Sequence, residues 1–419
     1  MNDRRKFNKA ILGGIIGAAG AVPVASSLMA SSPDRKFSDT EKSPAELITP
    51  ETQAAIDRGL NYLHRSQITT GRNRGAFAAS GLQSGVATAS LGGLAMMCGG
   101  HAPGFGKFGK AIDNSAQFVM NNVQETGYIS RRDLPSERMY GHGFSMLFLS
   151  QVYGMTKKAA IGEKLRKSVE LTSKTQNDDG GWRYEPRKSD ADLSITVCQI
   201  MGLRGARDAG IDVSDKVRTK CIEYVKRSQN ANGSFRYTLR GGHSTMAMTA
   251  AGVTSLYSSG VYDGEQIEKA LKRLLASKPR SSRGGHFFYT HYYAVQAMWH
   301  AGGEYWNTWY PAIRDVLIED QADDGSWRSS EAGPQFGAAM ACIILQMPLN
   351  YVPVFSPSQP ARHQLTLDES GYSFRLSSSV KYSVLNILVA PSQTVIRSPL
   401  RSNSLSTRSA SGTKMLPTC

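Results

Sequence analysis

The chain has 419 residues, 40% of them hydrophobic, which is enough to bury one large core. Its formal net charge of +15 is concentrated at the ends: residues 1–30 carry +3 and residues 357–419 carry +5, leaving +7 for the remainder. That remaining charge is scattered along the sequence and is not interleaved with aromatic residues. This distribution argues against a nucleic-acid partner.

Residues 1–30 have the pattern of an export signal. The twin arginine Arg4-Arg5 precedes a Gly- and Ala-rich stretch at 10–25, which is short and only mildly hydrophobic for a membrane span. The pattern resembles a twin-arginine (Tat) signal, so we expect a periplasmic or cell-envelope protein with no integral span once the signal is removed. An uncleaved anchor is the alternative. Residues 31–48 are predicted to be a polar linker.

A seven-residue motif, Gln-x-x-x-Gly-x-Trp, recurs along the middle of the chain. It occurs at 176–182 and 321–327, and a third copy at 229–235 has Phe in place of Trp. The copies begin 53 and then 92 residues apart, and 92 is two steps of 46. Repetition at this period is typical of an architecture built from one repeated unit.

Weaker copies at 67–77, 124–128 and 283–287 complete six units. A run that is apolar on all sides, and therefore predicts a buried helix, follows each copy; these runs are 87–97, 144–152, 194–203, 245–256, 292–299 and 336–345. The segments before the motifs, such as 217–226 and 267–275, are amphipathic and predict an outer layer. We therefore predict an all-α fold, an (α/α)6 toroid over residues 49–355. An open solenoid is the alternative, but the sequence lacks its polar end caps.

Neither the cysteines nor the C-terminal segment adds to this pattern. Cys98, Cys198, Cys221 and Cys342 lie in apolar helical segments and are expected to be buried free thiols, and no Cys-x-x-Cys pair indicates a structural zinc. Residues 356–419 are Ser- and Arg-rich without a sustained period. We interpret them as a disordered tail or a non-native extension.

The repeated motif resembles the QW motif of squalene–hopene and oxidosqualene cyclases, and the six-unit layout is similar to their toroids and to the β-subunit of protein prenyltransferases. The chain is most similar to exported bacterial prenyltransferase/squalene oxidase repeat proteins. The resemblance implies a structural motif in which the Gln amide bonds to a helix end and the aromatic ring packs over it. The implied scaffold residues are Gln176, Trp182, Gln229, Phe235, Gln321 and Trp327.

Two family activities can be compared with the sequence. Class II cyclases protonate an alkene with the motif Asp-x-Asp-Asp-Thr, and the resemblance places Asp190 and Asp192 on that motif with Leu193 replacing its last Asp. Asp192 would then be the general acid; the alternative is that it caps a helix starting at Leu193. Prenyltransferase activity is disfavoured because the Asp-x-Cys zinc pair is absent.

Aligning the predicted starts of the buried helices suggests a candidate site. His142, Asp192, His243 and His291 would then face one mouth of the central cavity, with Tyr140, Tyr289, Tyr292 and Tyr293 as aromatic walls. Such a set could hold a divalent metal with an open position, or act as acid and base, although no motif requires a cofactor. The alternatives are the rim of a simple ligand pocket, or histidines that cap and pack helices.

Three functions remain open from the sequence. The first is an exported toroid that binds, and in its enzymatic form transforms, an isoprenoid or other apolar ligand; the second is a non-catalytic interaction toroid. An open aromatic-lined cavity retaining Asp190 and Asp192 would favour the first, and a cavity filled by side chains the second. The third is a carbohydrate-active toroid, suggested by the clustered Trp299, Trp306 and Trp309 with Glu304 and Asp315 nearby.

Overall fold

The computed structural model describes residues 42–356 except 80, 81, 84, 135, 136, 278 and 280–285. Backbone contacts divide the chain into two units, Met1–Gln364 and Leu365–Cys419, and every described residue belongs to the first. The predicted signal, residues 31–41 of the predicted linker and residues 357–419 of the predicted tail therefore lie outside the described residues.

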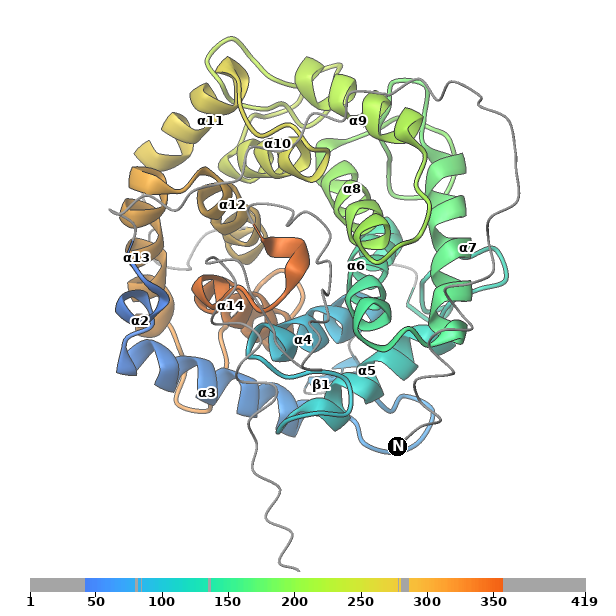
Figure 1. Cartoon of the computed structure of the whole chain (residues 1–419), viewed down its shortest axis with the longest axis vertical. Coiled ribbons are helices and arrows are strands. Elements are labelled where there is room, and N and C mark those ends of the chain that lie inside the picture. The colour runs from blue at the N-terminus through green and yellow to red at the C-terminus, as the bar shows by residue number, and fades with distance from the viewer. Residues whose placement is uncertain are drawn as a thin grey trace, which may run out of the picture. The chain divides into compact units, whose positions relative to one another are not determined.

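Twelve long helices form two concentric rings in the described part of the chain, as Figure 1 shows. The outer ring consists of α3 (Pro50–Ser66), α5 (Gly109–Asn121), α7 (Ala159–Thr175), α9 (Asp215–Arg227), α11 (Glu265–Ala276) and α13 (Gly303–Glu319). The inner ring consists of α4 (Val86–Cys98), α6 (Arg138–Thr156), α8 (Leu193–Asp208), α10 (Met246–Ser258), α12 (Phe287–Ala301) and α14 (Pro334–Leu345). The predicted all-α toroid is confirmed.

Short elements complete the fold. They are α2 (Pro44–Leu47), the antiparallel pair β1 (Ala78–Ala79) and β2 (Leu82–Gln83), and the 3-10 turns η2 (Met347–Leu349) and η3 (Pro353–Phe355). Among the described residues, none of the helices combines the length and the hydrophobicity that crossing a bilayer requires.

The two rings follow from two sequence patterns. Inner helices are apolar on all sides because they pack against both inner neighbours and the outer ring; nearly all residues of α4 and α14 are buried. Outer helices bury one stripe, and in α11 the buried residues are Ile267, Ala270, Leu271 and Leu274, at helical spacing. The ring closes because α14 packs against α3 and α4 and α13 packs against α3.

Each motif copy joins two successive outer helices. The Gln176 amide donates to Gly180 O in its own turn (2.9 Å) and to Val217 O at the start of α9 (2.9 Å). Gln229 bonds Gln266 O of α11 in the same way (2.7 Å), and Gln321 bonds Ala55 O of α3 (2.9 Å). The last copy therefore fastens the sixth unit to the first and closes the toroid.

The motif aromatics and glycines complete this joint. Trp182 Nε1 donates to Thr172 O and Trp327 Nε1 to Leu317 O, carbonyls in the last turns of α7 and α13 that a helix end leaves without a partner. Gly180 has φ +97°, and a Cβ there would lie 2.1 Å from Lys220 O. Only glycine permits both that conformation and that close approach.

Candidate functional site

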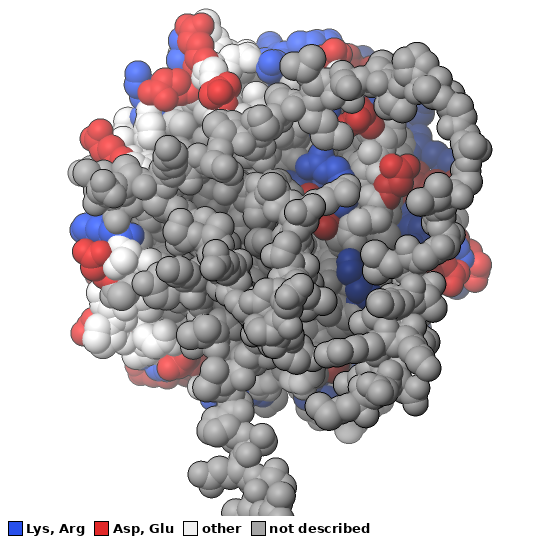
Figure 2. Space-filling model, viewed as in Figure 1, with Lys and Arg blue, Asp and Glu red and all other residues white. Residues whose placement is uncertain are grey.

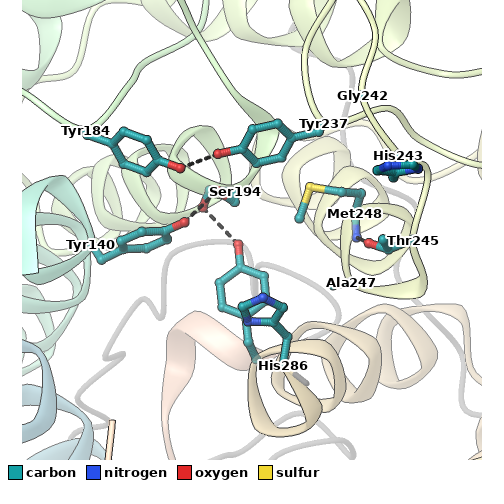
Figure 3. Close-up of a pocket in the computed structure, with 11 residues that line it drawn as sticks. Tyr140, Tyr184, Ser194, Tyr237, Gly242, His243, Thr245, Ala247, Met248 and His286 are labelled. Carbon is teal, nitrogen blue, oxygen red and sulfur yellow. Dashed lines mark hydrogen bonds between the residues drawn. The ribbon is translucent and has the colours of Figure 1, made fainter. Parts of the chain in front are cut away.

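The inner helices all start at one end of the toroid, because each is separated from the next by an outer helix running the other way. A pocket of about 430 Å³ lies at this end, over the starts of α8, α10 and α12 (Figure 3). Tyrosines dominate its walls. The lining residues are Tyr140, Tyr184, Ser194, Tyr237, Gly242, His243, Thr245, Ala247, Met248, His286 and Tyr289.

Ser194 forms the polar corner of the pocket. Its Oγ hydrogen-bonds Tyr140 Oη (2.6 Å), and its backbone carbonyl accepts from Tyr289 Oη (2.8 Å). Beside this corner the hydroxyls of Tyr184 and Tyr237 hydrogen-bond each other, and a dashed line marks this bond in Figure 3. Burial raises the pKa of Tyr237 and Tyr140 above the usual phenol value, so both hydroxyls remain protonated and able to donate.

Asp192 lies behind Ser194 and is fully buried. Its Oδ1 accepts from Ser194 Oγ (2.5 Å) and from Ile195 N (2.9 Å), so Asp192 caps α8 as the alternative reading of the sequence stated. Its Oδ2 has no hydrogen-bond partner and lies 3.7 Å from Arg183 Nε. Burial raises the pKa of this carboxyl, against the lowering effect of Ser194, Ile195 and Arg183.

Asp190 has a different environment. Its side chain is about half exposed, pairs with Arg183 (3.2 Å) and accepts from Ala191 N (2.9 Å). Arg183 is thus held by both aspartates and lies over the rings of Tyr184 (5.2 Å) and Tyr237 (5.8 Å). The Asp190–Asp192 pair shares a cation, whereas a cyclase acid requires one carboxylate to hold the other protonated.

Two further carboxylates cap inner helices from neighbouring loops. Glu137 accepts from Val86 N (2.8 Å) and Ala87 N (2.9 Å) at the start of α4, and Glu331 accepts from Phe288 N (2.9 Å) in α12. Burial raises the pKa of both carboxyls, although the backbone hydrogen bonds oppose that shift. These acids neutralise the positive ends of parallel helix dipoles that meet at this mouth.

The expected ring of histidines does not form. His142 is fully buried between the rings, where Nδ1 accepts from Ile129 N (3.1 Å) and Nε2 hydrogen-bonds Thr172 Oγ1 of α7 (2.8 Å). His291 packs against Phe287 (4.4 Å) and Trp309 of α13 (5.5 Å), again toward the outer ring. His243 alone of the three lines the pocket. The described residues contain no group of three His, Cys, Asp or Glu that could hold a metal.

The predicted ring fails because it places the start of α6 in the wrong register relative to the other inner helices. Trp182 N and Phe235 N donate to Thr196 and Thr249, as Ile129 N does to His142. His142 is therefore equivalent to Thr196, not to Asp192. Helix α6 starts at Arg138, well before the apolar run that was used to align it.

Of the four predicted tyrosines, two line the pocket and two lie in the centre of the toroid. Tyr140 and Tyr289 line the pocket, whereas Tyr292 and Tyr293 are fully buried beneath it. Tyr292 contacts Phe144 of the opposite helix α6 (5.8 Å) and Phe355 of η3 (6.3 Å), and Tyr293 Oη lies 3.1 Å from Cys198 Sγ. Figure 1 shows η3, at the end of the described chain, inside the inner ring. Side chains fill the centre at this level.

The structure also shows where the cysteines, the clustered tryptophans and the surface charges lie. Cys98, Cys198, Cys221 and Cys342 are buried and free, and burial raises the pKa of Cys198 and Cys221 to about 12. The tryptophans of the carbohydrate hypothesis, Trp299, Trp306 and Trp309, are buried between α12 and α13 and do not line an open cleft. On the face in Figure 2, Lys and Arg alternate with Asp and Glu around the visible edge.

Sequence reasoning missed Tyr184, Tyr237, Ser194, Met248 and His286. A signal for the first two was present: Trp182-Arg183-Tyr184 and Phe235-Arg236-Tyr237 place a tyrosine two residues after the aromatic of successive motif copies. Because the copies are equivalent, the two tyrosines occupy the same position after their turns and lie at the same end of the toroid. His286 had no such signal; it precedes α12 with φ +61°, a conformation uncommon for residues other than glycine.

Comparisons with known proteins agree with this architecture. No family model and no curated protein matches the chain. Among solved structures, cellobiose 2-epimerase from Bacillus thermoamylovorans is 9% identical with a TM-score of 0.55, covering 71% of this chain and 98% of that chain. The GH76 α-mannanase of Bacteroides thetaiotaomicron is 11% identical with a TM-score of 0.53, covering 74% and 98%.

A third solved structure is a type II terpene cyclase from Scytonema in complex with its product, merosterolic acid A. It is 12% identical with a TM-score of 0.50, covering 73% of this chain and 98% of that chain. At these identities the likeness shows the fold alone. The chain is an α/α toroid of the type found in terpene cyclases, GH76 mannanases and cellobiose epimerases.

Proposed function

We propose that the protein is an exported toroid that binds an apolar small molecule, isoprenoid or similar, in the pocket over the starts of α8, α10 and α12. The observation that carries the proposal is the pocket itself. Its volume of about 430 Å³ falls in the usual range of ligand sites, roughly 300–1,000 Å³. Its walls are four tyrosines and Met248, and its polar groups converge at Ser194. This combination suits an apolar body with one hydrogen-bonding group.

A series of hydrogen bonds at this pocket supplies a route for proton transfer. Tyr140 Oη, Ser194 Oγ and Asp192 Oδ1 are connected at 2.6 and 2.5 Å. With Asp192 protonated, its proton passes to Ser194, the Ser194 proton to Tyr140, and the Tyr140 proton to the ligand. The ligand gains one proton, and the Asp192 carboxylate that remains faces Arg183 (3.7 Å). We propose this relay for an enzymatic form of the function, with Asp190 holding Arg183 in place.

A second candidate, a non-catalytic interaction toroid of the cell envelope, is favoured by the filled centre. Tyr292, Phe144 and Phe355 occupy the space in which a long chain would otherwise be enclosed. The two candidates differ in whether the pocket is occupied by a small molecule. Export itself is proposed from the N-terminal sequence, and recovery of the cleaved chain from the periplasm would test it.

Native mass spectrometry of the full chain from the exported fraction tests the proposal directly, followed by titration with geranylgeraniol. We expect a bound apolar molecule, and Met248→Trp, which fills the pocket, should weaken geranylgeraniol binding at least tenfold. Lys272→Trp, at an exposed position on α11 outside the pocket, should leave binding unchanged. Asp192→Asn should retain binding and abolish any conversion.

Two results would contradict the proposal. If the protein carries no ligand and does not bind geranylgeraniol, the non-catalytic interaction toroid is the remaining candidate. Binding of a cello-oligosaccharide in the same pocket, blocked by Met248→Trp, would instead support a carbohydrate ligand.

A further inference from the structure

Two large apolar side chains are exposed among the described residues. They are Phe105, 71% exposed in the loop between α4 and α5, and Met155, 42% exposed in the last turn of α6. Exposed apolar side chains are unremarkable singly, and their arrangement decides whether they carry meaning. Both lie at the end of the toroid opposite the tyrosine pocket, where the inner helices terminate.

The two segments that carry these side chains both approach Asp113 of α5. The loop carrying Phe105 passes close to it, since a Cβ at Gly104 would lie 3.6 Å from Asp113 Oδ2. From the other side Lys158, three residues after Met155, places its Nζ 3.9 Å from Asp113 Oδ1. The loop 102–108, α5 and the α6–α7 connection therefore meet at one surface.

A basic hollow starts at this surface and continues along α5 to Met120 and Asn121 at the other end of the helix. A hollow of about 450 Å³ is lined by Arg72, Arg74, Lys110 and Lys158, and Asp113 is the acidic residue among its described lining. Helix α7 starts there, with Ala160 and Ile161 in the lining and no acidic residue in its first turn. Lys107, two residues after Phe105, is a further exposed cation near the start of this hollow, and it lines a separate hollow beside Asp57 of α3. We name this set, with Phe105 and Met155, the basic hollow.

We propose that the basic hollow docks the protein on an anionic phospholipid bilayer. Lipid phosphates occupy the hollow, and Phe105 and Met155 enter the boundary between headgroups and acyl chains. The charge complementarity is direct, because an anionic leaflet attracts clustered Lys and Arg within about one Debye length. An apolar tip flanked by cations is the combination that interfacial binding requires. A soluble anion would account for the cations but leave both apolar side chains without a role.

Vesicle cosedimentation with the full chain tests the proposal. We expect binding to vesicles of equal parts phosphatidylglycerol and phosphatidylcholine, weak binding to pure phosphatidylcholine, and loss of binding as salt screens the charges. Lys107→Gln with Lys110→Gln should weaken binding roughly fivefold per lysine, and Phe105→Ser about tenfold. The matched control, Lys269→Gln with Lys272→Gln on α11, removes the same charge from an exposed helix elsewhere and should bind as the parent does.

The basic segments 1–30 and 357–419 are common to all these variants. Equal binding of the parent, the Phe105 variant and the lysine pair would therefore overturn the proposal, since the end segments would then account for attachment. Inorganic phosphate that binds the free protein and is lost in the Lys107/Lys110 variant, without vesicle binding, would overturn it in favour of a soluble anion. Unchanged thermal unfolding of each variant establishes that the fold is intact.

Discussion

The motif turns and the starts of the inner helices differ in how far their chemistry repeats, although both recur around the same ring. The motif turns at 176–182, 229–235 and 321–327 share one chemistry: a Gln amide on the next outer helix, a glycine with positive φ against its backbone, and a buried aromatic. The inner-helix starts share almost none; their N-cap residues are Gly85, Glu137, Asp192, Thr245, His286 and Gly333. The uniform turns hold the ring together, and the varied starts of the inner helices line the pocket.

Breaking a turn should have the largest effect on stability. Trp327→Ala removes a fully buried indole and its bond to Leu317 O, and should lower the free energy of unfolding by about 3–5 kcal/mol. Trp327→Phe, the residue found in the third copy, should cost less, because it loses the hydrogen bond but keeps most of the buried ring. Chemical denaturation measures both. Equal losses for Ala and Phe would show that packing does not dominate this joint.

The second prediction concerns His142, which is buried behind the varied starts of the inner helices. Burial lowers its pKa to about 4, so the unfolded chain takes up the proton first as pH falls below about 6.5. Stability should then decrease from about pH 6.5 to 4, by roughly 3 kcal/mol for this residue. His142→Gln should flatten that slope, whatever it costs at neutral pH. A parent-like slope in His142→Gln would contradict the burial argument.

The smallest expected change is at Asp192. Asp192→Ala loses the cap of α8 and should cost about 1 kcal/mol, whereas Asp192→Asn still caps. Because burial raises the carboxyl's pKa, the folded state binds its proton more tightly, and the parent's stability should fall as pH rises through that pKa. Asp192→Asn lacks this titrating carboxyl and should gain stability relative to the parent as pH rises above about 4, the usual carboxyl pKa. Parallel curves would show that the carboxyl titrates normally.

Prediction from the sequence succeeded where the pattern was periodic. The apolar run at 194–203 anticipated most of α8, and the amphipathic segment 217–226 anticipated most of α9. It failed at the register of a helix start, because His142 is equivalent to Thr196, four residues after Asp192. The run at 144–152 gave no sign that α6 starts at Arg138, and that shift turned His142 away from the mouth.

Residues that act through distant partners were also out of reach. Glu137 and Glu331 cap helices α4 and α12 that begin far from them in sequence, and nothing local marks either as buried. Tyr184 and Tyr237 were within reach through their equivalent positions in two copies, but they reveal a pocket only when the two turns lie side by side.

The sequence by itself determined the twelve-helix toroid and the joints that close it, because periodicity and a repeated motif are local properties repeated around the ring. Only the tertiary structure decided what the ring encloses. Tyr292 meets Phe144 and Phe355 across the barrel, and Tyr140 meets Ser194 over a buried Asp192. Whether such side chains fill a cavity or line one depends on contacts between helices that are not neighbours in the chain, and no spacing in the sequence encodes them.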